Sequence, residues 1–394
     1  MFPNFFPFSN FHELNLDWIL ETLKGLKTQE QTVKEETDTL FNEYFDKYLK
    51  YTPNKNPENF FMMAEDFGVI GDGVTDNADA LEAAMIYCLN HNVGLGFKAG
   101  TYIVGRDIVV DDRKSGHEDF SLIMQGCGQG TIIKGGSITL AGNSHYIVSN
   151  MQFKFDGEKG LILGTGSNYA NRSLFVNCLI EGNPSALTLV FCNAVRFIGC
   201  RISSRAEYIP LPSAVYPVCE FANLSTYSGT VNSIAFIACH FEGTKSGGVF
   251  IYKPSGTKAA YGIAFYGCHF ETRNYASKIF DIVSGNVWTF DACVMTNNSY
   301  SGGGVTDGNE QAVNRADGVV NLSILHTLFD LKRTGNPPIA NIHSCSFCTI
   351  NGRYPDAVGD YVNYSGAGAD TLEIEVYSNS SKYTVQKRAN TVVG

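Results

Sequence analysis

The sequence predicts a mainly β protein, a parallel β-helix or solenoid, preceded by an N-terminal α-helical segment of coiled-coil type. Three observations lead to this prediction: a heptad pattern near the N-terminus, a recurring pattern of apolar residues and cysteine after it, and an unusual composition. Charged residues make up 17% of the 394 residues, and 40 residues are glycine. Soluble proteins average roughly 25% charged residues and about 7% glycine, so this chain is poor in charge and rich in residues that permit tight turns.

The composition also excludes several classes of protein. Hydrophobic residues make up 44% of the chain and aromatic residues 12%, which is too much for a disordered protein. No stretch approaches the ~20 apolar residues of a membrane-spanning helix. We expect no nucleic-acid binding, because 29 basic residues stand against 39 acidic ones. The N-terminus lacks the features of a secretory signal, and the 11 cysteines, an odd number, indicate reduced thiols in a protein made in a cytoplasm.

Residues 1–58 differ from the rest of the chain. A heptad frame begins at Leu16, and seven of its ten seam positions are apolar. The seam comprises Leu16, Ile19, Leu23, Leu26, Glu30, Val33, Thr37, Leu40, Tyr44 and Lys47. An isolated amphipathic helix is marginal in water, so this helix needs a partner; packing on its own globular domain is the alternative. The prolines and asparagines of residues 51–59 predict a linker.

The residues before this helix are strongly aromatic. Exposed aromatic side chains favour association unless something covers them. We therefore expect the N-terminus to insert into a larger assembly. The predicted docking residues are Phe5, Phe6, Phe8, Phe11 and Trp18.

A short helix near residues 76–90 is predicted after a glycine-rich turn. Thr75 or Asp76 is its expected N-cap, and Asp79 lies in the first turn, where the helix dipole favours a carboxylate. Its apolar face consists of Leu81, Ala84, Met85, Cys88 and Leu89. Residues 96–104 then read as a turn followed by a strand.

This segment carries a family resemblance. Residues 66–85 (DFGVIGDGVTDNADALEAAM) and 97–104 (FKAGTYIV) resemble the entry module of the pectate-lyase-like right-handed parallel β-helix superfamily. The resemblance implies the right-handed fold but no particular reaction, because lyases, hydrolases, epimerases and phage tailspikes share it. Together with the aromatic N-terminus, the chain resembles tailspikes and neck or tail appendages of bacteriophages, which assemble as homotrimers in the host cytoplasm. Residues 11–24 (FHELNLDWILETLK) resemble the attachment segments of such appendages in small podophages.

The pattern apolar-x-apolar-x-x-Cys-x-apolar recurs along the chain in four clear and four weaker copies. Its reference positions are Met151, Cys178, Cys200, Cys239, Cys268, Cys293, Thr327 and Cys345. Side chains alternate along a strand, so these positions are expected to point inward and to stack about 4.8 Å apart in successive coils. The cysteines are thus predicted to be structural. We expect a helical anchor at residues 1–58, a solenoid at 59–352 and a C-terminal segment at 353–394 that contains a strand at 371–377.

Residues one and three positions after the reference position should point outward. On two consecutive coils they form a square of His240, Glu242, His269 and Glu271, with Arg273 at its edge. Stacked carboxylates repel, which raises one pKa and suits the acid–base cleavage of a sugar polymer. The candidate catalytic residues are therefore Glu242 and Glu271, and the candidate ligand-binding residues are His240, His269, Arg273 and Glu181. The alternative is that repeat similarity on a solvated sheet produces the same pattern.

No metal ion or cofactor is expected. Cys345 and Cys348, near His343, form the one Cys-x-x-Cys pair, and no second pair stands at zinc-ligand spacing. The enzymatic signatures of the superfamily are also missing: Asp111 and Asp112 precede the coils, and no paired aspartates occur on a coil. Whether the chain is an enzyme stays open.

These features predict a virion protein, a phage tailspike or a neck or tail fibre. It would dock to other virion proteins through residues 1–50, form a homotrimer and bind a carbohydrate of the host surface. The alternative is a polysaccharide lyase or glycoside hydrolase on the same β-helix. A third possibility is a structural connector that binds no glycan.

Overall fold

The computed structural model describes most of the chain after residue 60. The described ranges are 61–111, 121–142, 145–157, 159–183, 185–204, 217–222, 230–243, 249–254, 260–272, 278–297, 314–330, 340–353, 362–365, 371–377 and 382–388. The predicted N-terminal helix and the docking residues Phe5, Phe6, Phe8, Phe11 and Trp18 lie outside these ranges.

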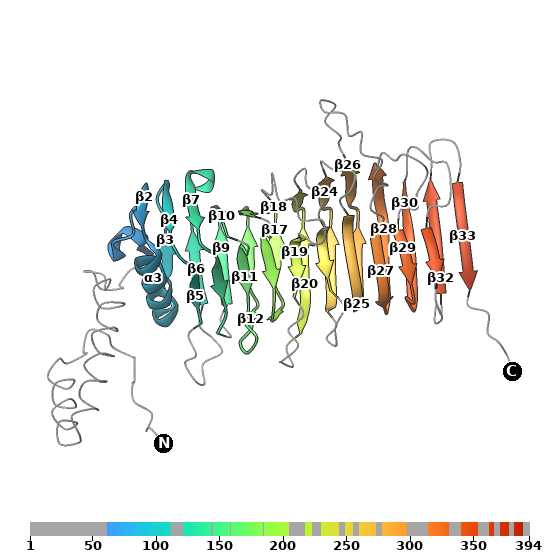
Figure 1. Ribbon diagram of the computed structural model, residues 1–394, viewed down its shortest axis with the longest axis horizontal. Coiled ribbons are helices and arrows are strands. Elements are labelled where there is room, and N and C mark those ends of the chain that lie inside the picture. Colours follow the sequence, from blue (N-terminus) through green and yellow to red (C-terminus); the bar gives the residue numbers. More distant parts are fainter. Residues whose placement is uncertain are drawn as a thin grey trace, which may run out of the picture. The chain divides into compact units, whose positions relative to one another are not determined.

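The described chain winds into a parallel β-helix, so the mainly β, solenoid part of the predicted fold class is confirmed (Figure 1). Each typical coil contributes a strand to each of three parallel stacks, and each strand pairs with the equivalent strands of the coils before and after it. The right-handed sense implied by the resemblance is the sense that parallel crossover connections take. None of the helices in the described ranges is long and apolar enough to cross a membrane.

The strands of each stack follow the chain. The first stack comprises β1 (Phe61–Met63), β3 (Gly94–Gly96), β6 (Ser121–Gln125), β9 (His145–Ser149), β13 (Leu174–Val176), β17 (Arg196–Ile198), β20 (Val231–Ile237), β23 (Tyr261–Tyr266), the end of β25 (Lys278–Asp291), β28 (Asn321–Asp330), β30 (Phe347–Arg353) and β32 (Thr371–Tyr377). The second comprises β2 (Asp72–Asp76), β4 (Gly100–Val104), β7 (Thr131–Gly135), β10 (Gln152–Phe155), β14 (Leu179–Gly182), β18 (Arg201–Ser204), β21 (His240–Glu242), β24 (His269–Thr272), β26 (Val294–Asn297) and the end of β28. The third comprises β5 (Ile108–Val110), β8 (Ile138–Leu140), β11 (Leu161–Leu163), β15 (Leu187–Leu189), β19 (Pro217–Phe221), β22 (Val249–Lys253), the start of β25, β27 (Asn314–Val319), β29 (Ala340–His343) and β31 (Val362–Ser365).

Four short elements and one antiparallel strand complete the described fold. These are the 3-10 turns η3 (Ala64–Phe67) and η4 (Gly128–Gly130), the strands β12 (Ala170–Asn171) and β16 (Cys192–Asn193), and β33 (Lys382–Arg388). The predicted strand at 371–377 is confirmed as β32, and parallel stacking extends to it. Strand β33 then runs antiparallel to β32 and ends the parallel order.

Helix α3 (Ala78–His91) packs against β3, β5 and β6 near the N-terminal end of the solenoid (Figure 1). Its predicted apolar face is buried. The predicted N-cap was wrong by one residue, because the cap residue is Asn77. The side chain of Asn77 bonds with the backbone of Ile70 in both directions, so the carboxylate of Asp76 accepts the Ala78 N–H (3.0 Å) in its place.

The core is a set of ladders in which the same side chain recurs on successive coils. Five phenylalanine rings stack with centroids 4.7–4.9 Å apart and with nearly parallel planes. They are Phe175, Phe197, Phe236, Phe265 and Phe290. All eight predicted reference positions are buried, and the cysteines form no disulfides. Their Sγ atoms lie near backbone carbonyls, such as Cys239 Sγ at 3.3 Å from Phe197 O on the preceding coil, so the cysteines pack as small apolar residues with a weak S–H donor.

The corner between the first and second stacks has one backbone conformation throughout. The residue before each reference position has a positive φ of 48–60° on seven coils. These residues are Asn150, Asn177, Gly199, Ala238, Gly267, Ala292 and His326. The left-handed residue bends the chain from a strand of the first stack into a strand of the second, and it is one of the two residues that the pattern places between its second apolar position and its cysteine.

The last predicted copy of the pattern is out of register. Cys345 follows a left-handed Ser344 at the corner between the third and first stacks, whereas the residue paired with Thr327 is Gly352. Cys348, expected to point outward, pairs with Leu322 and is 1% exposed, and Phe347, expected inside, is 42% exposed. The error arose because the pattern marks any left-handed corner of a coil, and the two corners cannot be distinguished by it alone.

Candidate functional site

The outward residues of the second stack form two columns in exact backbone register. One column runs through Arg201, His240 and His269, and the other through Ser203, Glu242, Glu271 and Thr296. The four residues of the predicted square therefore lie together on β21 and β24. Register follows from the inward phenylalanines beside them, because Phe241 and Phe270 stack at 4.8 Å and fix which residues face outward.

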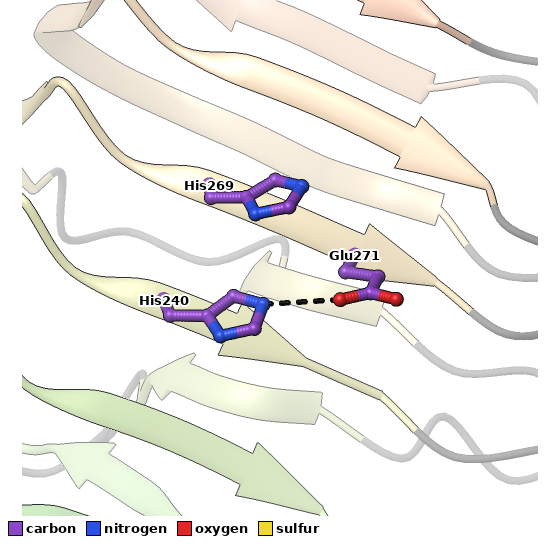
Figure 2. A group of neighbouring side chains, drawn as sticks. All are labelled: His240, His269 and Glu271. Atoms are coloured by element: carbon purple, nitrogen blue, oxygen red, sulfur yellow. Dashed lines mark ion pairs between the residues drawn. The ribbon is translucent and has the colours of Figure 1, made fainter.

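The side chains of these columns pair diagonally between coils. Arg201 contacts the carboxylate of Glu242 on the next coil. His240 Nε2 lies 3.3 Å from Glu271 Oε2, again one coil further, and His269 Nε2 lies 3.2 Å from Thr296 Oγ1 (Figure 2 shows the middle pair). Each carboxylate thus faces a basic side chain of the preceding coil, and the three contacts form a ladder of diagonal pairs along the stack.

The two histidines are stacked face to face. Their ring centroids are 4.9 Å apart and their planes differ by 10° (Figure 2). Burial lowers the pKa of His269, the neighbouring His240 lowers it further, and Glu271 opposes both effects. The side chains of Glu242 and Glu271 are 9% and 19% exposed, so the surface is partly shielded from solvent.

The other predicted site residues have different positions. Glu181 lies in the same column as Glu242 but two coils away, with Ser203 between them. Arg273 lies outside the described residues. The repeat pattern places Arg201 and Thr296 in the correct columns, but the sequence analysis did not assign them to the site. Their positions in the repeat, next to the histidines and glutamates, could have identified them.

A second polar column lies on the third stack, which the sequence pattern did not reach. Glu220, Tyr252, Asp281 and Arg315 are in register on four successive coils. Burial raises the pKa of Glu220, and Lys159 opposes the rise. Asp281 Oδ2 accepts from Lys278 Nζ (2.7 Å), while its buried Oδ1 has no hydrogen-bond partner among the described residues.

In the described ranges, one group of side chains of metal-ligating type lies close together. One ligand atom each from His240, His269 and Glu271 lies within 4.8 Å of the others. The Cys-x-x-Cys pair is not such a group: Cys345 and Cys348 are both buried, and burial raises the pKa of each thiol.

No protein-family profile matches the sequence, and no curated protein matches it. Solved structures similar to this chain include a Geobacillus virus E2 protein, ORF18 (15% identity, TM-score 0.48, covering 89% of this chain and 65% of that one). A tailspike of Acinetobacter baumannii bacteriophage Fri1, a capsular polysaccharide depolymerase, is 11% identical (TM-score 0.45, 85% and 66% coverage). The Streptococcus pneumoniae surface adhesin PfbA is 12% identical (TM-score 0.45, 83% and 98% coverage).

Similar structures thus include phage tailspikes, a surface adhesin and an α-1,3-glucanase. A glycan biofilm modifying enzyme of Pantoea stewartii, WceF, is described as having a bacteriophage tailspike-like parallel β-helix fold. The chain spans about two thirds of the length of the two viral structures, 65% and 66%. These likenesses concern the fold, whose assignment to the parallel β-helix class rests on the strand register of this chain.

Proposed function

We propose that the chain is a bacteriophage virion appendage that binds host-surface carbohydrate along its second stack. The observation that carries the proposal is the ladder of diagonal pairs formed by Arg201–Glu242, His240–Glu271 and His269–Thr296. It places charged and polar hydrogen-bonding groups at intervals of about 4.8 Å along one stack of strands. A polymer with repeated hydroxyl groups can be bound by such a surface, because the pairs hold the donors and acceptors in place before binding.

The N-terminal segment completes the proposed appendage. Residues 1–50 would dock into tail or neck proteins through Phe5, Phe6, Phe8, Phe11 and Trp18, and the heptads would hold a homotrimer. The support is the sequence pattern, since a seam with seven apolar positions needs partner helices. Sizing the purified full chain by light scattering tests this: three chains per particle are expected, and a monomer contradicts it.

Adsorption to host cells and to purified capsule tests the binding surface. We expect Arg201→Gln combined with Glu271→Gln to reduce adsorption at least ~10-fold, since both substitutions break diagonal pairs. The matched control is His326→Asn combined with Asp291→Asn, which breaks a comparable His–Asp pair (2.9 Å) outside the second stack. Equal adsorption by both double variants would overturn the proposal.

A second candidate function, glycan cleavage, is favoured by the column on the third stack. Glu220 and Asp281 lie two coils apart, which places their strands about 9.6 Å from each other. The two carboxyl groups of inverting glycosidases are about 6.5–9.5 Å apart, so this strand spacing lies at the upper limit of that range. A carboxyl with a raised pKa suits the acid. Glu220 would then be the acid and Asp281 the base.

Product analysis on capsule or wall glycan distinguishes the two candidates. If the chain cleaves glycan, we expect Glu220→Gln and Asp281→Asn each to lower the rate by at least ~100-fold, with adsorption retained. Asp291→Asn serves as the carboxylate control, because Asp291 lies on the first stack. If the unmodified protein adsorbs to the glycan without cleaving it, the carbohydrate-binding proposal stands and glycan cleavage is excluded.

A further inference from the structure

The cluster His240, His269 and Glu271 has features that sugar binding does not require. His240 and His269 occupy equivalent positions on β21 and β24, and Glu271 stands two residues after His269 on the same face. Two imidazoles and a carboxylate therefore lie together, and all three side chains come from strands of two coils (Figure 2). Strands hold side chains more precisely than loops do, which favours a site with strict geometry.

The contact between His240 and Glu271 is unusual. Nε2 of His240 is buried and lies 3.3 Å from Glu271 Oε2, yet the two atoms do not meet hydrogen-bond geometry. These two atoms are close, but they are not oriented for a hydrogen bond with each other. Such an orientation is expected of two ligand atoms that both face a third point between them. The ligand atoms of all three residues lie within 4.8 Å of one another. Ligands around a zinc ion at ~2.0–2.1 Å lie somewhat closer together than this, so small side-chain rotations close the site.

We propose that His240, His269 and Glu271 bind a first-row transition-metal ion of the Zn²⁺ type. Two neutral imidazoles with one carboxylate are donors that zinc and its neighbours accept, whereas calcium and magnesium take oxygen ligands. Three protein ligands leave a fourth position of a tetrahedral ion open. A water molecule or an oxygen of a ligand can occupy that position.

The surroundings supply partners for the ligands. Nε2 of His269 lies 3.2 Å from Thr296 Oγ1, which restricts rotation of that ring. The ring of His240 is held by stacking on His269. Such outer contacts orient metal ligands and commonly contribute 10–100-fold to metal affinity. The bound ion would also join two neighbouring coils across their outer surface.

Zinc binding to the untagged, chelator-treated full chain tests the proposal. After equilibrium dialysis with Zn²⁺, one ion per chain is expected by elemental analysis. Loss of a ligand should lower affinity more than the ~100-fold limit of outer-shell changes, so His240→Asn and Glu271→Gln should each abolish retention. Co²⁺ in place of Zn²⁺ should give the visible absorption of a four-coordinate site in the unmodified protein and not in the variants.

Two controls separate a site from general attraction. Glu242→Gln makes the same change in charge one coil away, and His326→Asn removes a histidine that has a single carboxylate partner. Both should retain one ion per chain with less than ~10-fold change. Glu271→Gln is nearly isosteric, and circular dichroism verifies its fold should His240→Asn fail to fold. Failure of the unmodified chain to retain zinc, or equal retention by Glu271→Gln, would overturn the proposal. The result does not depend on glycan binding, which is measured separately by adsorption.

Discussion

The entry segment, residues 61–111, and the coils from residue 145 onward are stabilised by different kinds of contact. Besides the buried apolar face of α3, the entry segment has single, non-repeated polar contacts. Asp72 accepts from Val74 and Thr75, Asn77 bonds with Ile70, and Arg106 bridges Asp79 and Glu82. The coils are held by the same apolar contact made repeatedly, as in the phenylalanine stack.

This difference affects what each region tolerates. A polar network depends on particular atoms, and loss of one partner leaves the other unsatisfied. A ladder of similar residues depends on volume and register, and its members differ mainly in how many neighbours they have. In the entry segment, the loss of stability on substitution should therefore depend on which hydrogen-bonding group is removed. In the coils, it should depend on where the residue stands along its stack.

The largest effect is expected in the middle of the phenylalanine stack. Phe236 stacks on Phe197 and Phe265, whereas Phe175 has one stacking neighbour in the series. Phe236→Ala should lower the free energy of unfolding by about 3–5 kcal/mol, and Phe175→Ala by less. Urea denaturation measures both. If the end of the stack is the more sensitive position, stability does not follow the number of neighbours.

The next effect tests the polar network. Asn77 is 1% exposed and its amide donates to the carbonyls of Ile70 and Thr75. Asn77→Ala should cost about 2–3 kcal/mol, because it leaves buried backbone groups unsatisfied. Asn193→Ala, at an exposed strand position, should change stability by less than about 0.5 kcal/mol. Similar losses for the two variants would contradict the proposed role of the network.

A smaller effect should depend on pH. Hydrogen bonds from the backbone N–H groups of Ala78 and Gly105 lower the pKa of Asp76. A carboxyl with a lowered pKa in the folded state stabilises above its unfolded pKa of about 3.9, and the contribution is lost as pH falls through the folded value. Asp76 is largely exposed, so we expect no more than about 1 kcal/mol after solvent screening.

Denaturation of the unmodified protein and of Asp76→Asn from pH 7 down to pH 2 measures this contribution. The difference between the two proteins should be greatest near neutral pH and should shrink below pH 4. A difference that is constant over the whole range would assign the effect of the substitution to shape rather than charge.

The smallest effect concerns the corner of the coils, and it has the opposite sign. Ala238 has a φ of 51°, and the residues at the same corner of the two neighbouring coils are Gly199 and Gly267. Ala238→Gly should raise the free energy of unfolding by about 0.5–1 kcal/mol, since glycine takes this conformation without strain. Ala264→Gly, in strand β23, should lower it by a similar amount. Destabilisation by both changes would show that the corner imposes no strain.

The sequence predicted the regions unequally. The entry segment was identified from a contiguous motif, and the helix end at His91 and the strand β4 lie where that motif implied. The coils were identified from a spaced pattern, which placed seven reference positions in one column and misplaced Cys345. Its spacing of 18 residues from Thr327 is shorter than the 25 that separate Thr327 from its register partner Gly352.

The sequence predicted those features of the candidate site that depend on backbone register, and no others. The columns of His240, Glu242, His269 and Glu271 follow from register, which the pattern fixes. The diagonal pairing depends on side-chain rotamers, which the pattern does not encode. The third-stack column could not be found, because the connections before β19 and β22 vary in length and no pattern marks Glu220, Tyr252 or Asp281.

Strand β33 has a consequence for association between chains. A parallel β-helix that simply stopped would expose an open strand edge, to which an identical edge of another molecule could add. Here the antiparallel β33 occupies that side of β32 along its whole length, from Thr371 paired with Arg388 to Tyr377 paired with Lys382. A further parallel coil cannot be added at that edge. Growth of the first stack by one more parallel strand therefore ends at the reversal of chain direction between β32 and β33.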